Sequence, residues 1–383
     1  MRGVQPPIVP IVGRWIRETP GTISLGQGMV SYGPPPEALA AARAFGDLSD
    51  HHRYGPVEGE AALVRALERK LAIENGIRVP PASRVVVTAG ANMGFLNAVL
   101  AVADPGDEII LPVPFYFNHD MAIVMAGCRT VPVRTAADYQ LDLDAIARAI
   151  TSRTRMVVTV SPNNPTGAVH HETALREVNA LCASRGLVHL HDAAYEYFTY
   201  EGAASFSPGA IDGAARHTIS LFSLSKAYGF ASWRIGYMVI PETLFDAVNK
   251  IQDTNLICPP LVSQHAALGA LQAGAAYTRT HLARLATVRE QVFARLATIA
   301  DVCEAPPTRG AFYVFLRLRA GLDAVTVAER LVREHRVAVI PGSAFGATEG
   351  CYLRVSYGAL GADTVVEGID RLVRGIRALT GAQ

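Results

Sequence analysis

The sequence predicts an α/β protein with two unequal domains, and three observations support this fold class. The chain has 383 residues, which exceeds the roughly 250–300 residues at which single hydrophobic cores usually stop growing. Its middle part alternates apolar, β-branched runs with helix-like segments, as expected for a buried sheet that is covered by helices on both faces. A long helix-like stretch then precedes a new strand-like pattern, which indicates a second, smaller domain.

The first βαβ unit is predicted between residues 84 and 112. Residues 84–88 form an apolar run, residues 92–102 have helical character, an Asp-Pro-Gly turn follows, and residues 108–112 form the next strand. Further apolar runs predict strands at 156–160, 187–190, 218–222 and 235–240, with a helix at 172–184. The long helical stretch covers residues 279–299, contains no Gly or Pro, and precedes the strand-like residues 310–318.

The composition argues against several classes of partner. The net charge is +1 and 18% of the residues are charged, so the chain lacks the basic surface that binding to nucleic acid or an anionic membrane usually requires. Its 5 cysteines stand singly, which argues against a disulfide framework or a zinc site and favours a reducing cytoplasm. No apolar stretch reaches the roughly 18 residues of a membrane-spanning helix, and the apolar run at 8–12 is a poor signal peptide. We therefore expect a cytoplasmic protein that binds a small molecule and no metal, nucleic acid or membrane.

The most informative segment, residues 223–237, places one lysine among small residues directly after a predicted strand. A lysine nucleophile needs a lowered pKa, which burial or a neighbouring cation supplies, and Arg234 is a candidate for that cation. Together with Ser223, Arg234 could also bind a phosphate dianion through charge-assisted hydrogen bonds. A phosphorylated aldehyde cofactor would use Ser223, Lys226 and Arg234 together. The alternative is a solvated surface lysine, which is far more common for a lysine taken in isolation.

Three other segments place polar groups where a predicted strand ends. Residues 161–167 contain Asn164 and would otherwise be an ordinary turn. Asp192 follows the strand at 187–190 and is well placed for a ligand, although it could instead cap a helix. Residues 88–94 run from a strand into a helix, so that the free backbone N–H groups of the first helical turn form an anion site, although a turn of this kind is weak evidence by itself.

In this order, and over nearly the whole chain, these segments resemble the fold-type-I pyridoxal 5′-phosphate (PLP) enzymes of the class I/II aminotransferase family. The resemblance implies a large domain, residues 41–280, with a mostly parallel seven-stranded sheet between helices. It also implies a smaller α+β domain, residues 281–383, with which the N-terminal segment 1–40 packs. Residues 54–59 resemble a family loop whose tyrosine, here Tyr54, reaches the phosphate of the neighbouring subunit. A homodimer with shared active sites is therefore implied.

The resemblance also implies how PLP is held. Lys226 would carry it as a Schiff base and shuttle a proton, and Asp192 would keep the pyridine nitrogen protonated. Tyr195 and Asn164 would bind the phenolic oxygen. Tyr116, with Phe115 as its alternative, would stack on the cofactor ring. The residues that would hold the phosphate are Ala91, Asn92, Ser223, Arg234 and Tyr54.

The substrate would be held through its α-carboxylate. The family arginine matched by Arg354 grips this carboxylate in a bidentate fork, Asn164 also contacts it, and the backbone of Gly28 lies against the substrate. No second arginine of the kind that a dicarboxylate side chain needs is identifiable. The segments near the pocket look like the branch that acts on aromatic amino acids and methionine. The candidates for side-chain contacts, each of which could equally be packing, are Met29, Tyr32 and Asn118.

We therefore expect a PLP-dependent aminotransferase that moves the amino group of an apolar or aromatic amino acid to a 2-oxo acid by a ping-pong mechanism. The same cofactor residues also serve lyases, cyclases and oxidases, so one of these reactions is the nearer alternative. A non-catalytic module that senses a ligand is the farther alternative, because every cofactor-binding residue of the family is intact.

Overall fold

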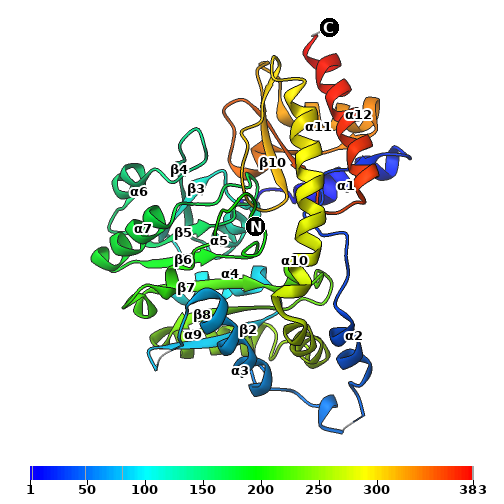
Figure 1. The fold of residues 1–383 in the computed structure, drawn as a ribbon. Helices are drawn as coiled ribbons and strands as arrows, with labels where there is room; N and C mark the ends of the chain where they lie inside the picture. The colour runs from blue at the N-terminus through cyan, green and yellow to red at the C-terminus, as the bar shows by residue number, and fades with distance from the viewer. Residues whose placement is uncertain (2, 48, 80, 382–383) are drawn as a thin grey trace.

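A seven-stranded sheet forms the centre of the structure, a computed structural model that describes residues 1, 3–47, 49–79 and 81–381 (Figure 1). The strand order is β2-β8-β7-β6-β5-β3-β4. β8 runs antiparallel to both of its neighbours, and the other neighbouring pairs are parallel. The mostly parallel seven-stranded sheet is therefore confirmed. Its strands are β2 (Ser83–Thr88), β3 (Glu108–Val113), β4 (Arg129–Arg134), β5 (Thr154–Val160), β6 (Val188–Asp192), β7 (Thr218–Ser223) and β8 (Gly236–Pro241).

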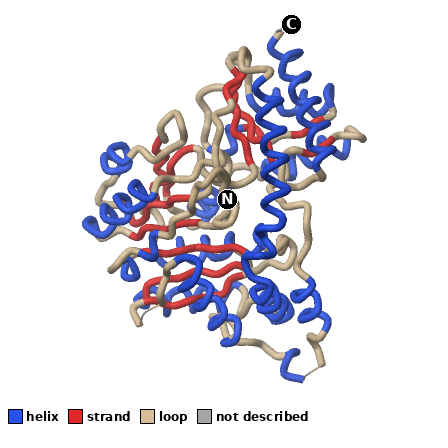
Figure 2. The backbone as a smooth tube through the Cα atoms, in the orientation of Figure 1, coloured by secondary structure: helices blue, strands red, loops and turns tan. Residues whose placement is uncertain are grey.

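Helices cover both faces of this sheet, as Figure 2 shows. Val86 packs into a buried cluster with Phe95, whereas Val85 and Val87 pack on the other face with Leu63. Because successive residues of a strand point to opposite faces, a strand buried on both sides is apolar throughout instead of alternating. The covering helices are α3 (Ala61–Lys70), α4 (Ala91–Val102), α5 (Phe117–Met125), α6 (Leu143–Ala149), α7 (Glu172–Arg185) and α9 (Phe245–Asn255).

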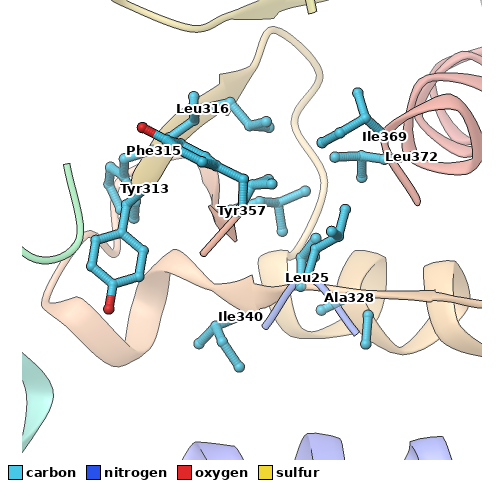
Figure 3. Packing of buried hydrophobic residues seen from close by; sticks show 14 of the residues in the cluster. Leu25, Tyr313, Phe315, Leu316, Ala328, Ile340, Tyr357, Ile369 and Leu372 are labelled. Atoms are coloured by element: carbon cyan, nitrogen blue, oxygen red, sulfur yellow. The ribbon is translucent and has the colours of Figure 1, made fainter. Parts of the chain in front are cut away.

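The C-terminal part contains a four-stranded antiparallel sheet in the order β12-β13-β10-β9. The N-terminal segment packs with this part, because β1 pairs with β11 and Leu25 shares one buried cluster with Ala328, Ile369 and Leu372 (Figure 3). The elements are α1 (Ile8–Glu18), β1 (Ile23–Ser24), β9 (Cys303–Glu304), β10 (Tyr313–Leu318), α11 (Ala324–His335), β11 (Val337–Ala338), β12 (Ile340–Pro341), β13 (Cys351–Ser356) and α12 (Ala362–Thr380).

A long helix, α10 (Leu261–Ala297), connects the two parts of the molecule (Figure 1). It packs against α2 (Pro36–Arg43) and α3 in its first part and against α12 further on. The backbone leaves the helical region at Gly274, with φ 64° and ψ −170°. The helix thus begins well before the predicted stretch at 279–299, and the predicted domain boundaries at 40 and 280 stay predictions. Among the described residues, no helix has the length and apolar character to cross a membrane.

Candidate active site

A cavity of about 200 Å³ lies where β5, β6 and β7 end. The carboxyl ends of neighbouring parallel strands lie at one edge of the sheet, so residues that are far apart in the sequence meet there. Among the residues predicted to act in catalysis, to bind the cofactor or to bind the α-carboxylate, only Tyr54 does not line this cavity; it is 79% exposed. The predicted site residues that line it are Gly28, Ala91, Asn92, Tyr116, Asn164, Asp192, Tyr195, Ser223, Lys226, Arg234 and Arg354.

Lys226 lies on α8 (Leu224–Ala227), a single turn that follows β7 directly. The Ser223 hydroxyl caps this turn by accepting a hydrogen bond from the backbone N–H of Ser225 at 3.1 Å. The lysine Nζ donates to the Gly28 carbonyl at 2.6 Å. Burial, together with the nearby Arg234 and Arg354 guanidinium groups, lowers the pKa of Lys226 to about 8, and Asp192 opposes this shift. About a tenth of this amine is therefore neutral at pH 7, far more than for an unperturbed lysine, as a lysine nucleophile requires.

Asp192, the last residue of β6, has two hydrogen-bond partners in the cavity wall. Its Oδ1 accepts from the backbone N–H of Ala194 at 2.9 Å, and its Oδ2 lies 3.1 Å from Nε2 of His119. An ionised carboxylate can only accept, so the His119 nitrogen is the donor. His119 stacks on Phe95 with ring centroids 3.9 Å apart. No role was predicted for His119, although its position three residues after Tyr116 at the start of a helix was a usable signal.

Arg354 lies on β13 and is 2% exposed. Its Nη1 donates to Asn164 Oδ1 at 2.9 Å and its Nη2 donates to the Gly26 carbonyl at 2.6 Å. Its guanidinium packs over the ring of Tyr313 at 4.8 Å. Its Nε is buried and has no hydrogen-bond partner among the residues that the structure describes. A buried guanidinium with a donor to spare suits a carboxylate ligand.

The opposite end of the cavity is built for an anion. Gly90 caps α4 with φ 83° and ψ 163°, so the backbone N–H groups of Ala91 and Asn92 begin the helix. The Arg234 guanidinium lies so close that a Cβ on Gly90 would be 2.2 Å from its Nη2. Arg234 itself has a φ of 56°, which is uncommon for a residue other than glycine and occurs often at functional sites. It donates to two backbone carbonyls, and in the described part of the chain no carboxylate pairs with it.

Of the two aromatic residues considered for stacking on the cofactor ring, Tyr116 lines the cavity. Its hydroxyl accepts a hydrogen bond from Asn118 Nδ2 at 2.8 Å. Phe115, the alternative, packs in the sheet core instead, where a Cβ on Gly346 would be 2.5 Å from its ring. The three candidates for side-chain contacts do not line the cavity: Tyr32 donates to the Lys226 carbonyl at 2.9 Å, and Asn118 is occupied by Tyr116. Met29, the third, is 43% exposed.

Tyr195 pairs with a second tyrosine, Tyr313, which was not among the predicted site residues. Its hydroxyl oxygen lies 2.6 Å from that of Tyr313, and the Nδ2 of Asn164 donates to it at 3.5 Å. Tyr313 is the first residue of β10 and lines the cavity. The wall is completed by apolar groups that include Val9 of α1 and Phe117 of α5.

The model of a family described as aminotransferase class I and II matches residues 20–372. The chain belongs to this family. It is 31% identical to "Aromatic-amino-acid aminotransferase 2" of Thermococcus litoralis, over 92% of this chain and 91% of that protein. It is also 31% identical to an aspartate aminotransferase of Pyrococcus abyssi, over 93% and 92% of the two chains. The crystal structure of an aromatic aminotransferase from Pyrococcus horikoshii superimposes with a TM-score of 0.87 at 30% identity and covers 96% of this chain and 99% of that one.

The enzyme is therefore a PLP-dependent aminotransferase of fold type I that uses amino acid and 2-oxo acid substrates. The residues of the cavity fit PLP. The N–H groups at the start of α4 and the Arg234 guanidinium offer hydrogen-bond donors for a phosphate, and Lys226 offers an amine of lowered pKa. Asp192 offers a buried carboxylate, and Arg354 keeps a free donor for the substrate.

Proposed function

We propose that the enzyme moves the amino group of an apolar or aromatic amino acid, of the methionine, phenylalanine, tyrosine or tryptophan type, to a 2-oxo acid by a ping-pong mechanism. The observation that carries this proposal is the chemistry of the cavity wall. Its cationic side chains are Lys226, Arg234 and Arg354, and the cofactor and the α-carboxylate would use all three. Val9 and Phe117 leave an apolar surface for the substrate side chain. A second carboxylate there would be unpaired, which costs several kcal/mol.

The residues at the phosphate end would hold PLP before any chemistry begins. Arg234 and Ser223 would bind the phosphate oxygens, helped by the N–H groups of Ala91 and Asn92 at the start of α4. Tyr116 would stack on the ring. PLP supplies an electron-withdrawing ring that stabilises negative charge at the substrate Cα. Arg354 and Asn164 would orient the substrate through its α-carboxylate, with the Gly28 backbone against it.

Two side chains would control the protons. Lys226 would take the proton from Cα and return it to the cofactor carbon that accepts the amino group, because its pKa of about 8 suits both directions of transfer. Asp192 would keep a proton on the ring nitrogen through a charge-assisted hydrogen bond, and His119 would hold the carboxylate in place. Tyr195 would donate to the phenolic oxygen of PLP.

Tyr54 supports a homodimer as part of this proposal. Its exposure and its absence from the cavity wall suit a residue that serves the neighbouring subunit's phosphate. Mixing Tyr54→Ala chains with Lys226→Ala chains should then restore activity, because each mixed dimer contains one site with both a good Tyr54 and a good Lys226. Absence of recovery in demonstrated mixed dimers, from two variants that are each strongly impaired, would contradict the shared site.

The substrate proposal is tested by comparing kcat/KM for phenylalanine and aspartate in three proteins. The natural enzyme should prefer phenylalanine. Val9→Lys adds a cation to the apolar wall and should lower that preference at least tenfold, which corresponds to about 1.4 kcal/mol. Val325→Lys is the matched control, because both valines are 37% exposed and Val325 does not line the cavity. A natural enzyme that prefers aspartate would overturn the proposal.

A further inference from the structure

Tyr313 is a buried tyrosine whose hydroxyl the reaction outlined above leaves without a role. Its side chain is 0% exposed and its ring meets the ring of Tyr195 edge to face, with centroids 5.4 Å apart. Figure 3 shows its hydroxyl pointing away from the packed residues Ile369 and Leu372. The two tyrosine hydroxyl oxygens are 2.6 Å apart, a normal to short hydrogen bond between hydroxyl groups.

The hydroxyl of Tyr313 is held in this position from two sides. A Cβ built on Gly28 would lie 2.4 Å from it, so the Gly28 backbone presses directly against the hydroxyl. The guanidinium of Arg354 lies over the Tyr313 ring, and the strand around Tyr313 is paired with Ser356 on β13. Tyr313 is therefore a fixed partner for Tyr195.

The direction of the hydrogen bond between the two tyrosines decides what Tyr195 can do. Each hydroxyl has a single proton to donate. If Tyr195 donated to Tyr313, it would have no proton left for a ligand in the cavity. Burial raises the pKa of Tyr313 to about 12, with the Arg354 guanidinium opposing, whereas burial and the neighbouring Tyr313 raise the pKa of Tyr195 well above its ordinary value. Both hydroxyls are therefore protonated near neutral pH. Since an ionised phenolic oxygen of PLP can only accept a hydrogen bond, Tyr195 would donate to that oxygen, and Tyr313 would be the donor to Tyr195.

We propose that Tyr313 is a positioning residue that donates its hydroxyl proton to Tyr195 and thereby turns the Tyr195 proton into the cavity, toward the phenolic oxygen of PLP. The inference rests on the proposed role of Tyr195. Hydrogen bonds in a chain polarise one another, so donation from Tyr313 also makes Tyr195 a stronger donor. A stronger hydrogen bond from Tyr195 draws negative charge away from the phenolic oxygen and competes with the protonated nitrogen that links the cofactor to Lys226. The oxygen then attracts that nitrogen's proton less strongly, so the pKa of the nitrogen falls.

This pKa is read directly from the absorbance of the lysine-bound cofactor during a pH titration, without any substrate. Tyr195→Phe should raise it, because the donor to the phenolic oxygen is lost. Tyr313→Phe should raise it by a smaller amount, and should add nothing in the Tyr195→Phe background. 3-Fluorotyrosine at position 313 keeps the side chain but makes its hydroxyl more acidic, and should lower the pKa. Tyr357→Phe is the matched control, a buried tyrosine of the same cluster outside the cavity, and should change nothing.

The outcomes separate the two ideas. The inference would be overturned, and the role of Tyr195 left intact, if the pKa shifts in Tyr195→Phe but neither in Tyr313→Phe nor in the protein with 3-fluorotyrosine at position 313. An equal shift from Tyr313→Phe with and without Tyr195 would overturn it as well, because the effect would not pass through Tyr195. An unchanged pKa in Tyr195→Phe would overturn the role of Tyr195 and the inference together. If Tyr313→Phe does not fold, the fluorotyrosine protein decides alone.

Discussion

Gly90→Ala is expected to weaken PLP binding in addition to lowering the free energy of unfolding. Gly90 has φ 83° and ψ 163°, a backbone region that is essentially restricted to glycine, where another residue costs about 1–3 kcal/mol. Its new Cβ would also lie 2.2 Å from Arg234 Nη2 and 2.8 Å from Cζ, so the guanidinium must move. Losing one hydrogen bond between this cation and the PLP phosphate costs about 1.5–3 kcal/mol. The affinity for PLP should therefore fall about 10- to 150-fold.

Gly274→Ala is the matched control for this experiment. Gly274 has φ 64° and ψ −170°, a similar backbone conformation, but nothing lies within 4 Å of the position of its Cβ. Both variants should lose free energy of unfolding, measured by urea denaturation of the cofactor-free protein. Only Gly90→Ala should bind PLP more weakly in a fluorescence titration, and its affinity for pyridoxal, which has no phosphate, should match that of the control. Equal PLP affinities in the two variants would refute the assignment of Gly90 and Arg234 to the phosphate.

Three further predictions concern the acid–base groups. The rate at which the cofactor-free enzyme binds PLP covalently should rise with pH and level off above about pH 8, because only the neutral amine of Lys226 attacks the PLP aldehyde. Stopped-flow absorbance measures this rate, and a rate that still rises at pH 10 would contradict the prediction. Asp192→Asn should still bind PLP but should remove the Cα proton more slowly by several orders of magnitude, where each tenfold change corresponds to about 1.4 kcal/mol of barrier. Near-normal single-turnover rates would argue against the proposed role of Asp192 at the ring nitrogen. Burial lowers the pKa of His189 and of His191 to about 3 in the folded state. As the pH falls below about 6.5, these two histidines therefore bind protons in the unfolded state while they stay neutral in the folded state. The free energy of unfolding should then decrease by up to about 1.4 kcal/mol per histidine for each pH unit down to pH 3, and equal urea midpoints at pH 7.5 and pH 5.5 would contradict this.

Local apolar patterns predicted six of the seven strands of the large sheet, and β4 was not predicted. Asn164, Asp192 and Lys226 each lie within four residues of the end of a predicted apolar run, and the topology of a parallel sheet is enough to bring such residues to one edge. The amino-terminal part of α10 was not predicted, because Gly269 and Gly274 weaken its helical pattern. Gly269 is required by packing, since a Cβ there would lie 2.5 Å from the carbonyl oxygen of Glu37 on α2.

The remaining site residues depend on contacts between distant segments. His119 gains its role only through Asp192, and Tyr313 only through Tyr195, which is 118 residues away in the sequence. Tyr32 was a candidate for substrate contact, yet its hydroxyl donates to the Lys226 carbonyl. The sequence could not predict this, because no periodicity fixes the direction of a side chain in a loop. Sequence motifs therefore identify the residues proposed to bind the cofactor better than the residues proposed to position them.

The most direct test of the proposed reaction is a single half-reaction without an amino acceptor. Phenylalanine or methionine mixed with the enzyme should convert the absorbance of the lysine-bound cofactor to that of pyridoxamine phosphate and release one 2-oxo acid per site, and an added 2-oxo acid should restore the original spectrum. Aspartate should convert the cofactor far more slowly. Continued consumption of the amino acid without an acceptor, with ammonia, peroxide or a cyclised product formed while the cofactor spectrum stays unchanged, would contradict amino transfer and favour a lyase, cyclase or oxidase.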